Sequence, residues 1–140
     1  MTVNEILSAL AHKLGELFPE RAVYYTQIPR EADGNHYIRC IDQSHTKKLG
    51  RRRERAYSFE VLYFCQKGDA LVFNDWAETL YSELEMLTVG GQLVHITGAH
   101  AEPGDDGVFH FVFDITVSGL LDPPAGEPMA ELEIREGLKE

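Results

Sequence analysis

Apolar side chains at the start of the chain recur at three- and four-residue spacing. The positions concerned are Val3, Ile6, Leu7, Leu10, Leu14 and Leu17. This spacing places all of them on one face of a helix. Thr2 or Asn4 is a suitable N-cap, and Pro19 prevents the helix from continuing beyond Phe18. The pattern therefore predicts an amphipathic helix over residues 3–18.

Three segments with a different pattern follow this helix. Residues 22–28 and 35–41 are rich in β-branched and aromatic side chains, which is typical of strands. In the segment 56–65 one face is uniformly apolar, whereas the other is mixed and becomes apolar near its end. The uniformly apolar face consists of Tyr57, Phe59, Val61, Tyr63 and Cys65. The intervening "DQSHTKKLGRR", residues 42–52, is polar, and we expect it to be an irregular connection.

The second half of the chain predicts another helix and two further strands. The helix begins near Asp69 or Asn74 and runs to Leu87, where "TVGG" ends it. Its buried stripe is formed by Phe73, Trp76, Leu80, Leu84 and Leu87. Residues 92–100 and 108–121 predict two strands around "AEPGDDG", whose Pro, Gly and Asp content is typical of a hairpin loop.

The predicted element order is α-β-β-β-α-β-β. Adjacent strands with short connections favour a mostly antiparallel sheet of about five strands, with the two amphipathic helices packed on it, in an α+β fold. We expect residues 1–121 to form a single domain. Residues 122–140 begin with "DPPAGEP" and are acidic, which predicts a C-terminal tail or arm. "AELEIRE" within it alternates weakly, so a short strand paired with a neighbouring subunit is a further reading.

Composition agrees with a small globular protein. The 140 residues are 44% hydrophobic and 26% charged, which is sufficient for one domain with a core. No apolar run reaches the roughly 20 residues that span a bilayer, and the N-terminus lacks the features of a signal peptide. These features predict a cytoplasmic protein with no membrane partner. Cys40 and Cys65 form no CxxC motif, and we expect reduced core thiols.

Positive charge is concentrated in one short stretch of an acidic chain. The formal net charge is −10, yet "KKLGRRRER", residues 47–55, holds six of the 13 Lys and Arg residues and one of the 23 Asp and Glu residues. The rest of the chain carries seven basic and 22 acidic residues, a net charge of −15. The six basic positions are Lys47, Lys48, Arg51, Arg52, Arg53 and Arg55. The acidic remainder argues against duplex DNA as a general partner.

Three interpretations of residues 47–55 remain open on the sequence alone. The stretch contacts nucleic acid that passes nearby, pairs with carboxylates of a partner or of a neighbouring copy, or is a solvated loop. Aromatic residues at base-stacking spacing do not accompany it, which argues against a typical RNA-binding sheet.

Catalytic and metal-binding signals are sparse. The chain contains no GxGxxG, P-loop, GxSxG or HExxH motif, so the residues give only weak signals of catalysis. If the last hairpin turns near Asp105, then His100 and His110 face each other and, with Asp105 or Asp106, are candidates for a zinc or nickel site. The alternative is a pair of surface histidines, because His110 alternates with an apolar Phe face.

Several phrases together resemble a known family. "LGELFPE" leads into "AVYYTQI", "RRRERAYSFEVLYF" is followed by a predicted helix, and "GVFHFVFDITV" closes the domain. Over about Ile6–Leu120, the chain resembles the tail-terminator, or tail-completion, proteins of long-tailed bacteriophages and related prophages. The second strand, "GNHYIRCI", departs from the proline and paired aromatics of those proteins, and the tail after Asp122 is additional.

The resemblance implies a structural, non-enzymatic virion protein without a cofactor. Such proteins form a ring, usually a homo-hexamer, at the head-proximal end of the tail tube. The ring ends tube polymerisation and offers a surface to the head–tail connector, and DNA passes through its lumen as a non-specific partner. The protein would occupy the host cytoplasm during assembly and then the virion tail. The six basic residues would then form a docking or lumen-facing loop.

Two other functions stay open on the residues alone. One is a small nucleic-acid-associated protein that uses residues 47–55. The other is a metal-binding protein that uses the hairpin histidines.

Overall fold

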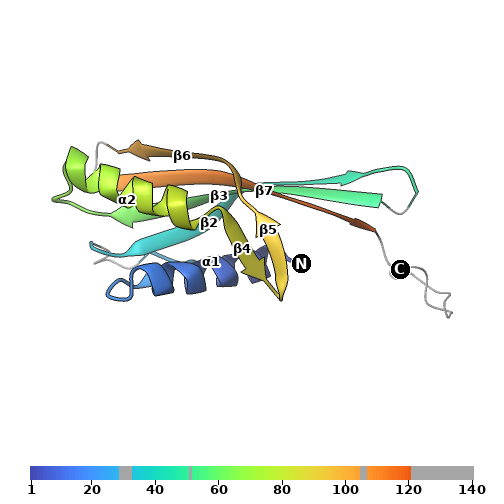
Figure 1. Ribbon diagram of the computed structural model, residues 1–140, viewed down its shortest axis with the longest axis horizontal. Helices are drawn as coiled ribbons and strands as arrows, with labels where there is room; N and C mark the ends of the chain where they lie inside the picture. Colours follow the sequence, from blue (N-terminus) through green and yellow to red (C-terminus); the bar gives the residue numbers. More distant parts are fainter. Residues whose placement is uncertain (29–32, 51, 105–106, 121–140) are drawn as a thin grey trace. The chain divides into compact units, whose positions relative to one another are not determined.

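A computed structural model describes residues 1–28, 33–50, 52–104 and 107–120 (Figure 1). Its elements are α1 (Val3–Leu17), β1 (Val23–Tyr24), β2 (His36–Lys47), β3 (Arg52–Phe64), α2 (Ala70–Glu83), β4 (Met86–Val89), β5 (Gln92–His95), β6 (Thr97–Pro103) and β7 (Val108–Leu120). The predicted α+β fold with a mostly antiparallel five-stranded sheet is confirmed. No helix in this described part of the chain is both long and apolar enough to cross a membrane.

The main sheet has the strand order β1-β2-β3-β7-β6, and β4 and β5 form a separate two-stranded sheet. The short β1 pairs in parallel with the start of β2, whereas β6 pairs antiparallel with β7. Two central strands, β3 and β7, are far apart in the sequence and are neighbours in the sheet. Their alternating apolar positions therefore meet on one face.

That face and the two helices enclose the core. Phe59 of β3 and Phe113 of β7 are fully buried, and their ring centroids lie 5.8 Å apart. Trp76 and Leu80 of α2 are buried against this layer. From α1, the residues Ile6, Leu10 and Leu14 are fully buried. The predicted apolar stripes of both helices thus supply the core.

Both ends of α1 follow from its sequence. The Glu5 N–H donates to Thr2 Oγ1 at 3.2 Å, and the Thr2 N–H donates to Glu5 Oε1 at 2.7 Å, which together form a capping box. At the other end, the Phe18 N–H donates to the Leu14 carbonyl at 2.8 Å. The chain then reaches Pro19, which cannot continue the helix.

The predicted end of the second helix at Leu87 is wrong. The helix ends at Glu83, and Met86–Val89 form β4, paired with β5 from Met86 opposite His95 to Val89 opposite Gln92. The physical reason lies in the turn, where Gly90 and Gly91 have φ values of 57° and 81°. Two positive φ angles favour a tight hairpin with right-handed strand twist.

The predicted irregular connection over residues 42–52 is also wrong over most of its length. The strand β2 continues to Lys47, and β3 begins at Arg52. The Lys48 N–H donates to the Arg52 carbonyl at 2.9 Å and closes the turn. Main-chain pairing stabilises these strands while residues 41–50 are all exposed. A search for buried apolar alternation therefore cannot detect them.

Two further strand boundaries differ from the prediction. Only Val23 and Tyr24 of the segment 22–28 form a strand, and the single strand expected over residues 92–100 is divided between β5 and β6. Cys40 and Cys65 are free thiols, as expected, but both are half-buried rather than in the core.

The chain forms two compact units. The first contains residues 1–43 and 56–116 and includes both helices and most of the sheet. The second contains Ser44–Arg55 together with the end of β7 from Val117. The predicted domain boundary at residue 121 and the tail 122–140 lie outside the described residues.

Candidate functional site

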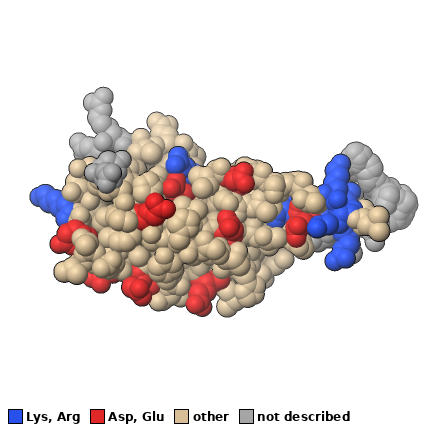
Figure 2. All heavy atoms as spheres, turned by 90° about the horizontal axis from the view of Figure 1, so that it is seen from above, with Lys and Arg blue, Asp and Glu red and all other residues tan. Residues whose placement is uncertain are grey.

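The basic stretch forms the hairpin between β2 and β3, which we call the cationic hairpin (residues 44–55). Lys47, Lys48 and Arg52 are exposed, and Leu49 at the turn is 93% exposed. Gly50 adopts φ 70°, a left-handed conformation that suits a residue without Cβ. Figure 2 shows Lys and Arg side chains gathered at this turn. The backbone thus holds the hairpin, and Lys47, Lys48 and Arg52 face water.

Contacts within the hairpin hold two of its basic side chains, those of Arg53 and Lys48. Arg53 Nη1 donates to the carbonyls of Gly50 at 3.1 Å and Arg52 at 2.8 Å, which holds its guanidinium against the turn. Lys48 Nζ lies 3.7 Å from Glu54 Oε1, an exposed pair that contributes about 0–1 kcal/mol. Arg51 lies outside the described residues. The six basic residues of this stretch outnumber its single acidic residue, so the hairpin can bind carboxylates or phosphates.

A second charged group lies on β3 within the other unit. Glu60 is only 8% exposed, although it occupies the face of the strand opposite Phe59 and Val61. Arg39 of β2 donates to its Oε1 from Nε at 2.8 Å, with Nη2 at 2.6 Å from the same oxygen. His110 Nδ1 of β7 lies 3.0 Å from Glu60 Oε2. Three neighbouring strands are therefore linked through one buried carboxylate.

Removal of Arg39 should weaken the fold through this carboxylate. We expect Arg39→Ala to lower the free energy of unfolding by roughly 1–2 kcal/mol, because Glu60 stays buried after losing a charged donor. Urea titration at pH 7 measures the change. Lys67→Ala, at an exposed site, is the control and should change stability by no more than about 0.5 kcal/mol. Equal effects of the two substitutions would contradict the prediction.

The histidines proposed for a metal site are not directly opposite each other. His110 lies opposite Glu102, and His100 lies opposite Val112, so the expected register is wrong. The pairing of β6 with β7 is offset by two residues from the expected register. His110 instead contacts Glu60, and His100 Nε2 lies 3.6 Å from Glu102 Oε2.

Metal-binding side chains are dispersed through the part of the chain that the structure describes. There, no group of three or more His, Cys, Asp or Glu side chains is arranged to hold a metal ion. Asp105 and Asp106, the other candidate ligands, lie outside the described residues.

The structure also contains a buried histidine that the sequence patterns did not single out. His36 is fully buried at the start of β2, and Trp76 Nε1 of α2 donates to its Nε2 at 3.1 Å. Burial lowers the pKa of His36 to about 3, and the nearby cation of Arg21 contributes in the same direction. The side chain is therefore neutral at physiological pH. The only sequence signal of its burial is its position two residues before Ile38, which places both side chains on the same face of β2.

Aromatic rings surround this histidine and the arginine beside it. The His36 ring lies 4.9 Å from Tyr63 and 5.0 Å from Phe18, measured between centroids. The Arg21 guanidinium lies 4.5 Å from the Phe18 ring centre and 4.3 Å from that of Tyr63. These contacts, worth roughly 0.5–2 kcal/mol per cation–aromatic pair, connect the end of α1 to the sheet and to α2.

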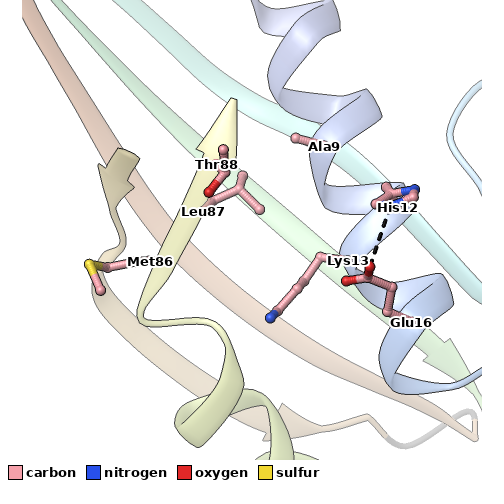
Figure 3. A pocket seen from close by; sticks show the side chains of 7 residues that line it. All are labelled: Ala9, His12, Lys13, Glu16, Met86, Leu87 and Thr88. Carbon is pink, nitrogen blue, oxygen red and sulfur yellow. Dashed lines mark ion pairs between the residues drawn. The ribbon is translucent and has the colours of Figure 1, made fainter. Parts of the chain in front are cut away.

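A groove of about 270 Å³ lies between α1 and β4 (Figure 3). Its lining consists of Ala9, His12, Lys13, Glu16, Met86, Leu87 and Thr88. His12 Nε2 and Glu16 Oε2 are 3.4 Å apart on one wall, and both side chains are exposed. The mixture of both charges and apolar groups favours no single class of ligand.

Comparison with models of protein families assigns the chain to one of them. The model of a family described as phage tail terminator protein matches residues 5–127. The chain belongs to this family. The resemblance inferred from the sequence is thereby confirmed.

Other comparisons add little to this assignment. A solved structure similar to this tail terminator has 15% identity to it and a TM-score of 0.46, over 88% of this chain and 99% of the other. At that level the likeness carries no argument about function. A search of curated proteins found no match.

Family membership fixes the general role of this tail terminator. The family is structural rather than enzymatic, and the role belongs to the phage tail. The cationic hairpin, Glu60 and His36 all lie within the matched residues. The match assigns no function to any one of them, so the role of the six basic residues stays a prediction.

Proposed function

We propose that this tail terminator assembles into a closed ring, a homo-hexamer, on the head-proximal end of the tail tube. The ring ends tube polymerisation and joins the tail to the head–tail connector, without catalysis. The observation that carries this proposal is the family match over residues 5–127, nearly the whole described domain. Assembly would take place in the host cytoplasm, and the product would be part of the virion tail.

The charge distribution supports contacts between different surfaces. Subunits of a cyclic ring meet head to tail, so two unlike surfaces of the same chain must be complementary. The cationic hairpin carries six basic residues and one acidic residue, whereas the rest of the chain has a net charge of −15. Such contrast directs association and fixes its geometry more than it adds affinity. We infer that the hairpin faces carboxylates of a neighbouring copy, of the tube or of the connector.

The test is the mass of the free protein by light scattering over a range of concentrations, alone and with the tail-tube protein of the same phage. Electron microscopy then examines any large species. We expect a ring of about six copies, either in the free protein or on tube ends, and shorter tubes when the terminator is present. Tubes of unchanged length with no terminator at their ends would overturn the proposal.

Charge reversal in the hairpin provides a sharper test of how the ring forms. We expect Arg51→Glu combined with Arg52→Glu to raise the apparent dissociation constant of assembly by roughly tenfold or more, since close interfacial charge pairs contribute about 1.5 kcal/mol or more. Added salt should weaken assembly of the unaltered protein in the same direction. Sedimentation measures both effects.

The matched control reverses two lysines elsewhere, Lys13→Glu with Lys67→Glu, which changes net charge equally. If the control weakens assembly as much as the hairpin variant, net charge rather than the hairpin is responsible. If the hairpin variant assembles normally on tubes but binds DNA less well, the hairpin faces the lumen instead of a subunit.

A further inference from the structure

Two buried nitrogen atoms near the end of α1 lack a hydrogen-bond partner. In the described part of the chain, the buried side-chain nitrogen and oxygen atoms without a partner are Arg21 Nη1 and His36 Nδ1. Burial without a partner is unfavourable for a polar group, and more so for a charged one. Both atoms therefore need a partner that the described residues do not supply.

The hydrogen bond from Trp76 shows which ring nitrogen of His36 carries a proton. Trp76 Nε1 can only donate, and it lies 3.1 Å from His36 Nε2, which must therefore accept. Because burial lowers the pKa of His36 to about 3, the ring is neutral at physiological pH, and its single proton lies on Nδ1. His36 Nδ1 and Arg21 Nη1 are thus both donors, and each needs an acceptor.

The two donor groups are neighbours, since they lie against the same pair of aromatic rings. The Arg21 guanidinium lies 4.5 Å from the centre of the Phe18 ring and 4.3 Å from that of Tyr63. The corresponding distances from the His36 ring are 5.0 and 4.9 Å. The His36 N–H donates to the Ala22 carbonyl at 2.9 Å, which holds the backbone next to Arg21 against the start of β2.

Arg21 supplies both a positive charge and an approach from solvent. Its side chain is 24% exposed, and its Nε lies 3.6 Å from Oε1 of Glu20, whose side chain is 70% exposed. This contact uses Nε and leaves Nη1 without an acceptor. The acceptor that Nη1 lacks would be bound most strongly if it were an anion, because hydrogen bonds between two charged groups are the strong ones.

A water molecule is a poorer match to these two donors than an anionic oxygen. A water molecule can accept from both, but it also needs acceptors for its own two hydrogens. Neither Arg21 Nη1 nor His36 Nδ1 can accept, so the two unpartnered atoms offer it none. A carboxylate accepts only, and it has two oxygens for the two donors.

We propose that Arg21 and His36 form a binding site for one carboxylate group. One carboxylate oxygen accepts from Arg21 Nη1 and the other from His36 Nδ1, beside the rings of Phe18 and Tyr63. The carboxylate belongs to a small organic acid or to an acidic side chain of another protein, and both sources offer the same two oxygens. This site is additional to ring formation and does not rest on it.

NMR of the full chain tests the site with sodium acetate as the probe. Long-range proton–nitrogen spectra should show the His36 proton on Nδ1 in the free protein. When acetate replaces chloride at constant ionic strength, the Nδ1 signal should shift saturably, with a dissociation constant on the order of millimolar for so small a ligand. A proton on Nε2, or a His36 signal that acetate does not shift, would overturn the proposal.

Capped tripeptides distinguish the two sources of the carboxylate. If acetyl-Ala-Glu-Ala-amide binds about fivefold or more tightly than acetate, the site receives an acidic side chain of another protein, whose neighbouring atoms add contacts. Equal or weaker binding assigns the site to a small organic acid. Acetyl-Ala-Gln-Ala-amide has the same shape without the charge and should not bind. If it shifts the His36 signal as the Glu peptide does, the site does not recognise a carboxylate and the proposal is wrong.

A matched pair of variants separates the site from net charge. Arg21→Gln removes the cation of the site, whereas Lys67→Gln removes one positive charge at an exposed position. Arg21→Gln should raise the dissociation constant for acetate by about tenfold or more, because a charged donor is lost, and Lys67→Gln should change it by no more than about twofold. Equal effects would indicate attraction by net charge and would contradict the site. The titration of the unaltered chain decides the question even if Arg21→Gln fails to fold, and failure to form a ring would not affect it.

Discussion

Lowering the pH from 7 to 4.5 should destabilise this protein by about 2.5 kcal/mol through His36 alone. The pKa of His36 falls from 6.5 to about 3 in the folded state, first because of its burial and then because of Arg21. Between these two values the unfolded chain binds a proton that the folded chain excludes. Each pH unit in this window then costs up to about 1.4 kcal/mol. The contribution is fully present above about pH 6.5 and is lost as the pH falls towards 3.

The measurement is urea unfolding at several pH values between 7 and 4.5, followed by the fluorescence of Trp76, the only tryptophan. His36→Gln removes the titration but keeps an oxygen that can accept the Trp76 Nε1–H bond. This variant should be less stable at pH 7 and should lose stability less steeply on acidification. His12→Gln is the control, because that histidine side chain is 81% exposed. Equal slopes for the unaltered protein and His36→Gln would contradict the prediction.

The elements found from sequence are those that bury an apolar face. The stripe of α1 and the alternating faces of β3 and β7 are regular because burial selects apolar side chains at each inward position. The residues at their centres, such as Leu10, Phe59 and Phe113, are fully buried. Fold class followed from these few long patterns, since their order and short connections limit the sheet topology.

The elements missed are those formed by backbone pairing or turn geometry. The end of β2 pairs through main-chain groups while its side chains face water, so no pattern marks it. The β4–β5 hairpin is short, and its buried Leu87 also fits the helical stripe of α2. The register of β6 on β7 depends on turn length and includes an irregularity between Thr97 and His100. Because the predicted register was wrong, His100 and His110 are not directly opposite each other.

The residues of the candidate site also divide into those that a sequence pattern reveals and those that depend on contacts in the fold. The basic stretch was found because six basic residues in nine positions are visible in composition alone, although its hairpin structure was not predicted. Glu60 and His36 were not found, because their character comes from partners distant in sequence. His36 bonds to Trp76, 40 residues away, and Glu60 bonds to His110, 50 residues away. A single sequence gives no measure of such proximity.

Phe111→Ala should destabilise the fold by about 3–5 kcal/mol, a larger loss than we expect from Arg39→Ala. Phe111 of β7 is fully buried, with its ring 5.3 Å from Tyr81 and 6.4 Å from Trp76. Truncation leaves a cavity where β7 meets α2 and removes the ring against which Tyr81 packs. The Tyr81 hydroxyl accepts a bond from the Ala101 N–H at 2.9 Å, so its displacement also releases β6 from α2. The cavity and the loosened edge strand both reduce stability.

Urea unfolding at pH 7 measures this change, with two controls. Phe111→Leu keeps most of the buried volume and should cost clearly less than Phe111→Ala. Leu71→Ala, at a position that is 73% exposed on α2, should change stability by no more than about 0.5 kcal/mol. Hydrogen exchange at Ala101 should accelerate more in Phe111→Ala than exchange at the centre of β3, because β6 loses its contact with α2. A loss of stability below about 1.5 kcal/mol in Phe111→Ala would contradict the prediction. It would mean that α2 moves onto the sheet and fills the cavity, so that Phe111 is not tightly packed against that helix.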